Sequence, residues 1–352
     1  MLNISKAELC EKLAVVKQVI NSKAQIEATR GALIANGRIV STDLTTFISV
    51  PIDTDESFIL PFKAIQMIEQ LPDGFISISN TDKKICIQSD TITSRFSTFD
   101  ATDFPALPEI SEIESVAIET EFFKTAISNT IFLAKESTSN PVYGGVCIKH
   151  GIDGVDFVAC DGIRLVNYTA GSLKNKIDCV IPKHAAAIAV SVCSDSENVL
   201  IGATAKHLIL DIGDKKIITR VLGGQYLDFK KILNVKRKEI KLDAGLLRGC
   251  ISRSVVVCSD IMAPVKLEIG NGYMNIEANT ADGTYNENIT FESNDEENSI
   301  HIGVNSVKFL ELLKKFGSGE ITLEYTKPTE AIIIRKDNLK AMILPVKLRT
   351  EG

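Results

Sequence analysis

The feature that most limits how this chain can fold is an internal repeat. Along its 352 residues, one order of signals returns three times, about every 120 residues. In each third a short apolar strand leads directly into a helix start, at Pro61, Pro182 and Asn305, which are 121 and 123 residues apart. Proline suits the first turn of a helix because the N–H that it lacks would have no partner there. A period of this length predicts repeated structural units rather than one large core.

Further strand signals follow each of these helix starts at matching offsets. The next strand begins at Ile76, Val199 and Ile321, and the one after it contains Ile85–Ile87, Leu208–Leu210 and Ile332–Ile334. A last strand is expected near Phe96, Ile218 and Ala341. Because several elements keep one period, chance is a poor explanation for the repeat.

A longer helix opens each third. In the first third, the apolar spacing predicts a helix over Lys6–Ile20, and Ser5 and Glu8 fit a capping box at its start. We expect the chain to run from Met1–Asn3 straight into this helix. The other two opening helices follow Thr120 and Asp243.

Alternating, strand-like segments separate the two helices of each third: Gly31–Val50, Gly145–Val166 and Val265–Phe291. The order helix, strands, helix, strands predicts an α+β fold in which helices pack on one face of antiparallel sheet. We therefore expect three similar domains, over residues 1–114, 115–236 and 237–352.

Composition and charge exclude several classes of protein. Apolar residues make up 45% and charged residues 24%, which is typical of a globular chain. The formal net charge of −6 argues against a protein that grips nucleic acid with its whole surface, although basic residues recur on or beside the predicted helices. No apolar run is long enough to span a bilayer, and no signal peptide is evident at the start.

The eight cysteines form no CxxC pair and mostly lie within apolar runs, as expected for small buried side chains in a reducing cytoplasm. The four histidines are scattered, so we expect no metal site. The sequence also lacks a phosphate-binding loop, a GxGxxG turn after a strand, HExxH and GxSxG. Cys160 and Asp161 beside Arg164 suggest a nucleophile only weakly, because no histidine is near. We therefore expect no cofactor.

Five segments, in one order along the chain, carry a resemblance to a known family. They are Asp100–Pro105 with Leu107–Glu109, Val158–Leu165, Gly224–Lys231, Ala278–Thr280 and Met342–Leu348. The second resembles a "TDxHRL" strand and turn, the third a "GxFPDYxR" segment and the last an "MPMRL" ending. Together they resemble the beta subunit of bacterial DNA polymerase III, the replication sliding clamp.

The resemblance implies a DNA-clamp fold and a head-to-tail homodimer that closes into a ring of six domains around double-stranded DNA. Twelve helices of about 10 Å each would line a hole about 38 Å across. It implies a non-catalytic processivity factor in the bacterial cytoplasm, on the nucleoid. Its partners would be the polymerase III alpha subunit, the clamp loader, and other polymerases and repair proteins, which dock short peptide motifs.

The family's peptide-binding pocket can be carried over residue by residue. Its second-domain wall would be Tyr143, Cys160, Gly162, Ile163, Arg164, Leu165, Leu227, Lys231 and Ile232. Its third-domain wall would be Met262, Asn305, Lys308, Thr329, Ala331, Met342, Ile343, Leu344, Pro345, Val346, Lys347 and Leu348. Ile163 replaces the usual His, Leu227 replaces the usual Pro, and Arg349–Gly352 extend past the usual end, so the preferred partner motif is left open.

Two further sets of residues follow from the resemblance. Contacts to DNA map to Lys23, Lys135, Ser137, Pro141, Val142, Lys183 and His184. The ring interface maps to Arg95, Phe96 and Phe99 of one subunit and to Arg253, Val256 and Val257 of the other.

Two other functions stay open on the residues alone. The first is an enzyme with an unrecognised site between domains, although the sequence supplies no convergent set of catalytic groups. The second is a three-repeat scaffold that binds partners and never encircles DNA. Retention on circular DNA separates this scaffold from a clamp, and stimulation of a polymerase separates a clamp from an enzyme.

Overall fold

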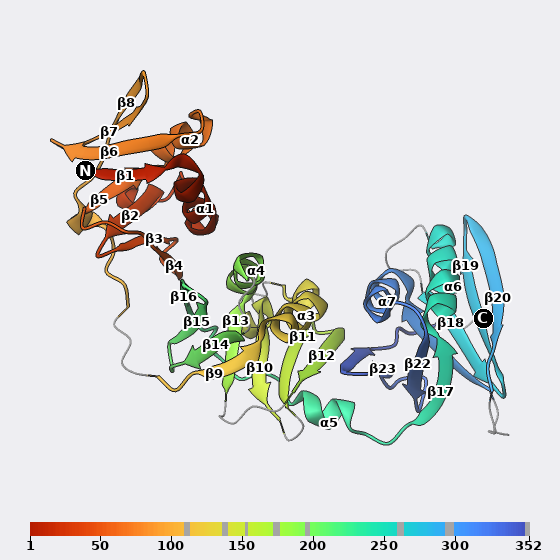
Figure 1. The fold of residues 1–352 in the computed structure, drawn as a ribbon. Helices are drawn as coiled ribbons and strands as arrows, with labels where there is room; N and C mark the ends of the chain where they lie inside the picture. The colour runs from red at the N-terminus through yellow and green to blue at the C-terminus, as the bar shows by residue number, and fades with distance from the viewer. Residues whose placement is uncertain are drawn as a thin grey trace. The chain divides into compact units, whose positions relative to one another are not determined.

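The computed structural model describes residues 1–108, 113–135, 140–151, 154–171, 177–193, 198–258, 264–292 and 299–348 (Figure 1). Its internal contacts divide the chain into two compact units. The first unit holds residues 1–127 and 173–223, and the second holds residues 128–172 and 224–352. The three domains expected from the sequence, with boundaries after residues 114 and 236, stay a prediction.

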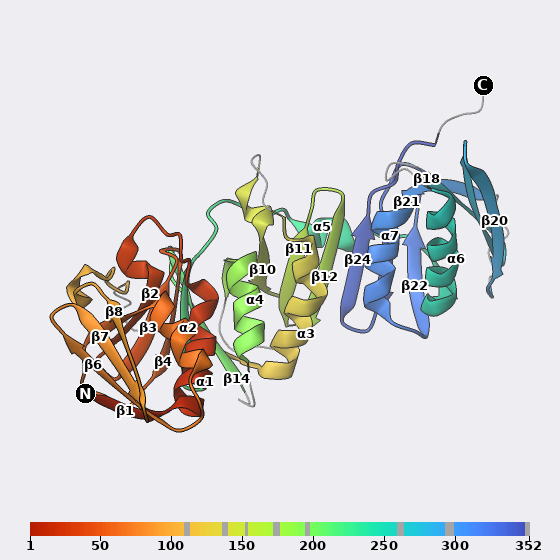
Figure 2. The same cartoon turned by 90° about the horizontal axis from the view of Figure 1, so that it is seen from above.

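The described residues include the six helices that the repeat predicts (Figure 2). These are α1 (Lys6–Val16), α2 (Phe62–Gln70), α3 (Thr120–Thr130), α4 (Lys183–Val192), α6 (Ala244–Val257) and α7 (Ser306–Leu313). A further short helix, α5 (Phe229–Leu233), is not among the predicted helices. Its five residues give too little periodicity for a helix to be recognised from the sequence.

The start of the chain differs from the prediction in two ways. Leu2–Ser5 forms a strand, β1, before α1 begins, because Leu2 and Ile4 alternate with polar residues and are both buried. Ser5 does cap α1, since its Oγ accepts a hydrogen bond from the backbone N–H of Glu8 at 3.2 Å. The α-helix ends at Val16 and continues only as a 3₁₀ turn, so the predicted extension to Ile20 is wrong.

The first unit contains two antiparallel sheets. One has the strand order β1-β6-β7-β8, and the other has the order β5-β2-β3-β4-β16-β15-β14-β9. Their strands are β2 (Gly31–Ala35), β3 (Arg38–Thr42), β4 (Thr46–Pro51), β5 (Phe58–Pro61), β6 (Phe75–Thr81), β7 (Lys84–Ser89), β8 (Ile92–Ser97), β9 (Val116–Glu119), β14 (Asn198–Ala203), β15 (His207–Ile212) and β16 (Lys215–Arg220). A further strand of this unit, β13 (Asp178–Pro182), leads into α4. The pairing of β4 with β16 places Ile48 opposite Ile217, so one sheet joins strands of two repeats.

The second unit is built in the same way. It contains a sheet with the order β20-β19-β18-β21 and the run β10-β11-β12-β24-β23-β22-β17. The strands are β10 (Gly145–His150), β11 (Val155–Cys160), β12 (Arg164–Ala170), β17 (Lys238–Asp243), β18 (Pro264–Gly270), β19 (Tyr273–Thr280), β20 (Gly283–Thr290), β21 (Ile300–Asn305), β22 (Glu320–Tyr325), β23 (Ile332–Lys336) and β24 (Leu339–Ile343). Here β12 pairs with β24, which again joins strands of two repeats.

Helices α1 and α6 each pack one face against a sheet. In α1 the side chains of Leu9, Leu13 and Val16 are fully buried, and the helix contacts β3 and β4. Burying one such side chain contributes about 1.5–3 kcal/mol to stability. In the second unit α6 and α7 lie side by side (Figure 2), and α6 also contacts β19 and β20. Leu246, near the start of α6, is 45% exposed.

All eight cysteines are free, and six of them are buried. Burial raises the pKa of Cys193 and of Cys250 to about 11, which suppresses the reactive thiolate. The cysteines therefore act as small apolar side chains, as the sequence predicts. No helix among the described residues is long and apolar enough to cross a membrane.

Candidate functional site

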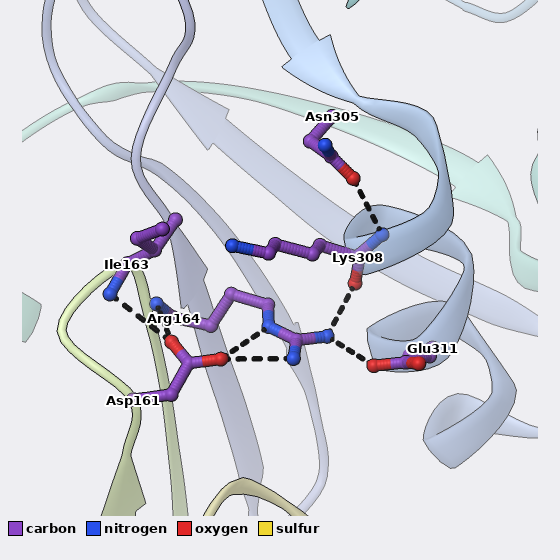
Figure 3. A network of polar contacts seen from close by, with 6 residues as sticks. All are labelled: Asp161, Ile163, Arg164, Asn305, Lys308 and Glu311. Atoms are coloured by element: carbon purple, nitrogen blue, oxygen red, sulfur yellow. Dashed lines mark hydrogen bonds and ion pairs between the residues drawn. The ribbon is translucent and has the colours of Figure 1, made fainter. Parts of the chain in front are cut away.

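The turn between β11 and β12 is held by a buried arginine (Figure 3). Arg164, only 5% exposed, donates from Nε and Nη2 to Oδ2 of Asp161 at 3.0 and 2.8 Å. Its Nη1 donates to the carbonyl oxygen of Lys308 at 3.0 Å and to Oε2 of Glu311 at 2.6 Å. One guanidinium therefore fixes the turn before β12 to helix α7.

Asp161 organises the same turn from within. Its Oδ1 accepts hydrogen bonds from the backbone N–H groups of Ile163 at 3.0 Å and Arg164 at 2.8 Å. Burial alone would raise the pKa of Asp161, but the backbone and side-chain hydrogen bonds from Arg164 outweigh it and hold that pKa below its ordinary value. The carboxylate stays ionised and serves a structural role.

The tip of this turn presents apolar surface. Gly162 adopts φ of +86°, which favours glycine, and Ile163 beside it is 36% exposed. The backbone N–H of Leu344, which follows β24, donates to the carbonyl of Ile163 at 2.9 Å. Leu344 is 40% exposed. The structure therefore brings two predicted pocket residues together as neighbouring exposed side chains.

Several other predicted wall residues are buried in the sheet. Leu165 lies opposite Cys160 on β11 and opposite Met342 on β24, so the three form a row across neighbouring strands. All three, and Ile343, are at most 7% exposed. Buried side chains of this kind offer little contact area to a partner.

Two tyrosines stand beside this row. The rings of Tyr143 and Tyr226 meet edge to face, with centroids 5.7 Å apart. The hydroxyl of Tyr226 donates to the carbonyl of Val158 at 3.3 Å. Burial raises the pKa of Cys160 and of Tyr226, so neither acts as a nucleophile at neutral pH.

The tail that follows β24 passes close to β21. The backbone N–H of Val346 donates to the carbonyl of Gly303 at 2.9 Å. A Cβ at Gly303 would lie 2.5 Å from the carbonyl oxygen of Val346, so only glycine permits this approach. Pro345, Val346 and Leu348 are half-buried, whereas Lys347 is exposed.

The segment Leu227–Ile232, which includes most of α5, carries three further predicted residues. Leu227 and Ile232 are half-buried, and the carbonyl of Ile232 accepts from Nη2 of Arg237 at 2.8 Å. Lys231 is exposed and pairs with Oδ2 of Asp228 at 3.2 Å.

The residues expected from the last third are spread more widely. Asn305 is buried and caps α7, since its Oδ1 accepts from the backbone N–H of Lys308 at 2.9 Å. Lys308 is half-buried, Thr329 is exposed and Ala331 is buried. Met262 lies outside the described residues.

The predicted DNA contacts differ in exposure. In the first unit Lys23, Lys183 and His184 are exposed, and Nε2 of His184 lies 3.7 Å from Oδ2 of Asp43. In the second unit Lys135 and Pro141 are exposed, but Val142 is fully buried and so cannot touch DNA in this conformation. Ser137 lies outside the described residues.

The predicted interface residues lie at an edge strand of the first unit and at the end of a helix of the second. Arg95 and Phe96 belong to β8, an edge strand, and Phe99 just beyond it is 39% exposed. Near the edge strand β20, Val256 at the end of α6 is 82% exposed and Val257 is half-buried. Edge strands carry unpaired backbone groups and are templates for pairing with another chain.

Arg253, a predicted interface residue, already forms an ion pair within its own chain. Its Nε and Nη2 donate to the two carboxylate oxygens of Glu287 on β20, at 2.9 and 2.6 Å. Hydrogen bonds from Arg253 and Tyr285 lower the pKa of Glu287 to about 2. Sequence reasoning missed Glu287 and Glu311, because the partners of an arginine across two elements leave no local pattern.

Among the described residues, no group of three or more His, Cys, Asp or Glu side chains could hold a metal ion.

Two models of one protein family match the second and the last third of the chain. Residues 117–228 match the family model of the DNA polymerase III beta subunit, central domain, and residues 233–347 match the model of its C-terminal domain. A curated relative, the beta sliding clamp of Staphylococcus aureus, is 24% identical over 311 residues, which cover 85% of this chain and 82% of the relative. The beta sliding clamp of Helicobacter pylori is 22% identical over 284 residues, covering 78% and 75%.

Solved structures show the same fold along the full length. A putative DNA polymerase III beta subunit from Eubacterium rectale superposes with a TM-score of 0.90 at 21% identity, covering 99% of both chains. The DNA polymerase sliding clamp from Bacillus subtilis gives 0.89 at 22% identity, again over 99% of both chains. Because the two domain models together match more than half of its length, this chain belongs to the DNA polymerase III beta subunit family.

Proposed function

We propose that this chain is a sliding clamp, a ring-shaped homodimer that encircles duplex DNA and tethers the replicative polymerase to it. The observation that carries the proposal is the match to both beta-subunit domain models. Curated relatives that are named beta sliding clamp support the same function. A clamp of this family is a processivity factor and not a catalyst. The repeat, with two helices in each third, agrees with this architecture.

Partners dock at the surface around Ile163 and Leu344. These side chains are exposed and adjacent. The hydrogen bonds of Arg164 fix the turn that carries Ile163. Apolar anchors on a rigid support suit short peptide motifs. The alpha subunit of the polymerase, the clamp loader and other polymerases and repair proteins are the proposed partners. One solved relative, from Pseudomonas aeruginosa, is described as bound to griselimycin.

DNA is held by the ring and not by tight contacts. A net charge of −6 gives little general attraction to phosphates, so retention has to come from topology. The exposed side chains of Lys23, Lys135 and Lys183 would supply loose contacts. Weak contacts of this kind let a ring slide.

Two subunits close the ring head to tail. The edge strand β8 with Phe96 and Phe99 of one subunit would meet the end of α6 with Val256 and Val257 of the other. The edge strand β20 lies near this end of α6. Pairing it with β8 would satisfy the backbone groups of both edges and cover Val256. Each subunit would have three domains, with boundaries after residues 114 and 236. The protein would act in the bacterial cytoplasm, on the nucleoid.

The test is retention on circular DNA. The chain is loaded onto nicked circular DNA with a clamp loader, the complex is isolated, and the DNA is then cut once. A clamp stays on the circle and leaves after linearisation, whereas a scaffold that binds DNA directly is indifferent to the cut. Light scattering comes first, and a mass near twice 38.4 kDa is expected. A monomer at every concentration that never stays on circles contradicts the proposal.

A further inference from the structure

The guanidinium of Arg164 is held by hydrogen bonds that run within its own plane. Its Nε and Nη2 donate to Asp161, and its Nη1 donates to the carbonyl of Lys308 and to Glu311 (Figure 3). A guanidinium is planar, and all its N–H donors point outward within that plane. These hydrogen bonds fix the group within the plane, but they resist a tilt out of the plane less strongly.

An aromatic ring lies against the flat side of this guanidinium. The Cζ atom of Arg164 lies over the ring of Phe132, 6.0 Å from the ring centroid. The face of an aromatic ring attracts a cation, and the attraction is stronger where the cation is shielded from water. Arg164 is 5% exposed, so its contact with Phe132 is largely shielded. The ring therefore opposes the tilt that the hydrogen bonds leave weakly restrained.

Phe132 is itself held in place within the second unit. It belongs to the 3₁₀ turn Ile131–Leu133 that follows α3, and this turn contacts strands β11 and β12. Nζ of Lys315, a residue that follows α7, lies 5.0 Å from the centroid of the same ring. The same Nζ donates to the carbonyl of Ser128 on α3 at 2.8 Å. The turn and the end of α7 together fix the ring against Arg164.

We propose that Phe132 is a positioning residue for the docking surface around Ile163 and Leu344. Its ring holds the guanidinium of Arg164, which in turn holds the carboxylate of Asp161. Oδ1 of Asp161 then accepts from the backbone N–H groups of Ile163 and Arg164, and so sets the shape of the turn. The role in docking rests on the proposed function, whereas the effect on the turn does not.

A purely space-filling role for Phe132 makes a different prediction. Phe132 is half-buried, and a leucine in its place would fill much of the same volume. A leucine has no aromatic face, however, so it could not attract the guanidinium of Arg164. A change that keeps the apolar bulk but removes the ring therefore separates the two roles.

The first test is hydrogen exchange of the full, unliganded chain, measured by mass spectrometry on a fragment that contains the backbone N–H groups of Ile163 and Arg164. Phe132→Leu should raise the exchange rate of these groups roughly threefold, a factor typical of one cation–π contact. Phe132→Tyr keeps the ring and should exchange as the unaltered chain does.

Lys315→Met is the matched control. It removes the other cation over the same ring but leaves the contact between Phe132 and Arg164 in place. Exchange of the fragment should therefore change less than twofold in this variant. A general loosening between the 3₁₀ turn and α7 would instead raise the exchange rate in both Lys315→Met and Phe132→Leu.

The second test measures docking, with a fluorescent peptide that carries two leucines as the probe. Its affinity, followed by anisotropy, should fall roughly threefold in Phe132→Leu, mainly through faster dissociation, and should recover in Phe132→Tyr. Equal affinity for the unaltered chain and Phe132→Leu would overturn the role in docking and leave the proposed function intact. A peptide that does not bind even the unaltered chain would contradict the proposed function, and the role in docking with it.

Two exchange results would overturn the proposal at the level of the turn. One is an unchanged exchange rate in Phe132→Leu, and the other is an equal rise in Lys315→Met. If Phe132→Leu does not fold, as judged by circular dichroism, Phe132→Met takes its place. Methionine is also apolar and lacks a ring, so the same threefold rise is expected and its absence contradicts the proposal.

Discussion

Arg164 and Glu311 form an ion pair of 2.6 Å that joins the turn before β12 to helix α7. The same guanidinium is paired with Asp161, but the two carboxylates differ in their surroundings. The Asp161 side chain is 8% exposed, whereas that of Glu311 is 48% exposed. The inner pair is therefore shielded from water, and the outer pair is partly screened.

This difference predicts unequal costs of mutation. Arg164→Met leaves the Asp161 carboxylate buried without its cation, and we expect the free energy of unfolding to fall by about 3–5 kcal/mol. Glu311→Gln removes only a half-exposed partner and should cost no more than about 1 kcal/mol. Urea unfolding followed by circular dichroism measures both. Equal losses in the two variants would show that the network has no buried centre.

A second prediction concerns acid pH. The pKa of Glu287 is about 2 in the folded chain, below the ordinary value of 4.5, because Arg253 and Tyr285 donate to it. A lowered pKa means that this carboxylate stabilises the fold above pH 4.5 and loses that contribution as the pH falls towards 2. Carbon-detected NMR should show Glu287 titrating near pH 2. In Arg253→Ala its midpoint should rise towards 4.5, and an unchanged midpoint would disprove the pairing in solution.

The repeat made much of the fold predictable. Helix starts and strands returned at a constant offset, so a weak local signal at Ile76 was supported by its equivalents at Val199 and Ile321. What the sequence could not provide was the pairing of strands between repeats. The contact of Ile48 with Ile217 depends on register between segments that are far apart, and alternation alone does not specify the partner strand.

Only the resemblance predicted the site. It did not predict which residues of the site are exposed. Ile163 and Arg164 are neighbours in sequence, yet one is 36% exposed and the other 5%. An arginine is rarely buried, so residue type alone would have assigned the reverse. The Asp161 turn and the distant Glu311 decide the outcome, and neither partnership is encoded in a local pattern.

A third prediction tests the proposed peptide surface. Ile163→Asp and Leu344→Asp place charge on the two adjacent exposed anchors, and each should weaken the binding of a fluorescent partner peptide at least tenfold, because a buried anchor is worth about 1.5–3 kcal/mol. Fluorescence anisotropy measures the affinity. Leu246→Asp, which changes a similarly exposed leucine on α6, is the control and should bind as the unaltered chain does. Tight binding by both anchor variants would place the docking surface elsewhere.

The last prediction concerns the ring. Val256 is 82% exposed at the end of α6, the largest exposed fraction among the large apolar side chains of the described residues. The proposed ring contact would cover this side chain together with Val257. Changing both Val256→Glu and Val257→Glu would bury two charges in the proposed contact, so sedimentation should show a mass near 38.4 kDa in place of twice that value. Leu200→Glu, on β14 and 41% exposed, adds charge at a strand that belongs to neither predicted interface segment and should leave the dimer intact. A dimer that survives the double change would remove the end of α6 from the interface, and the edge strand β8 would then need another partner.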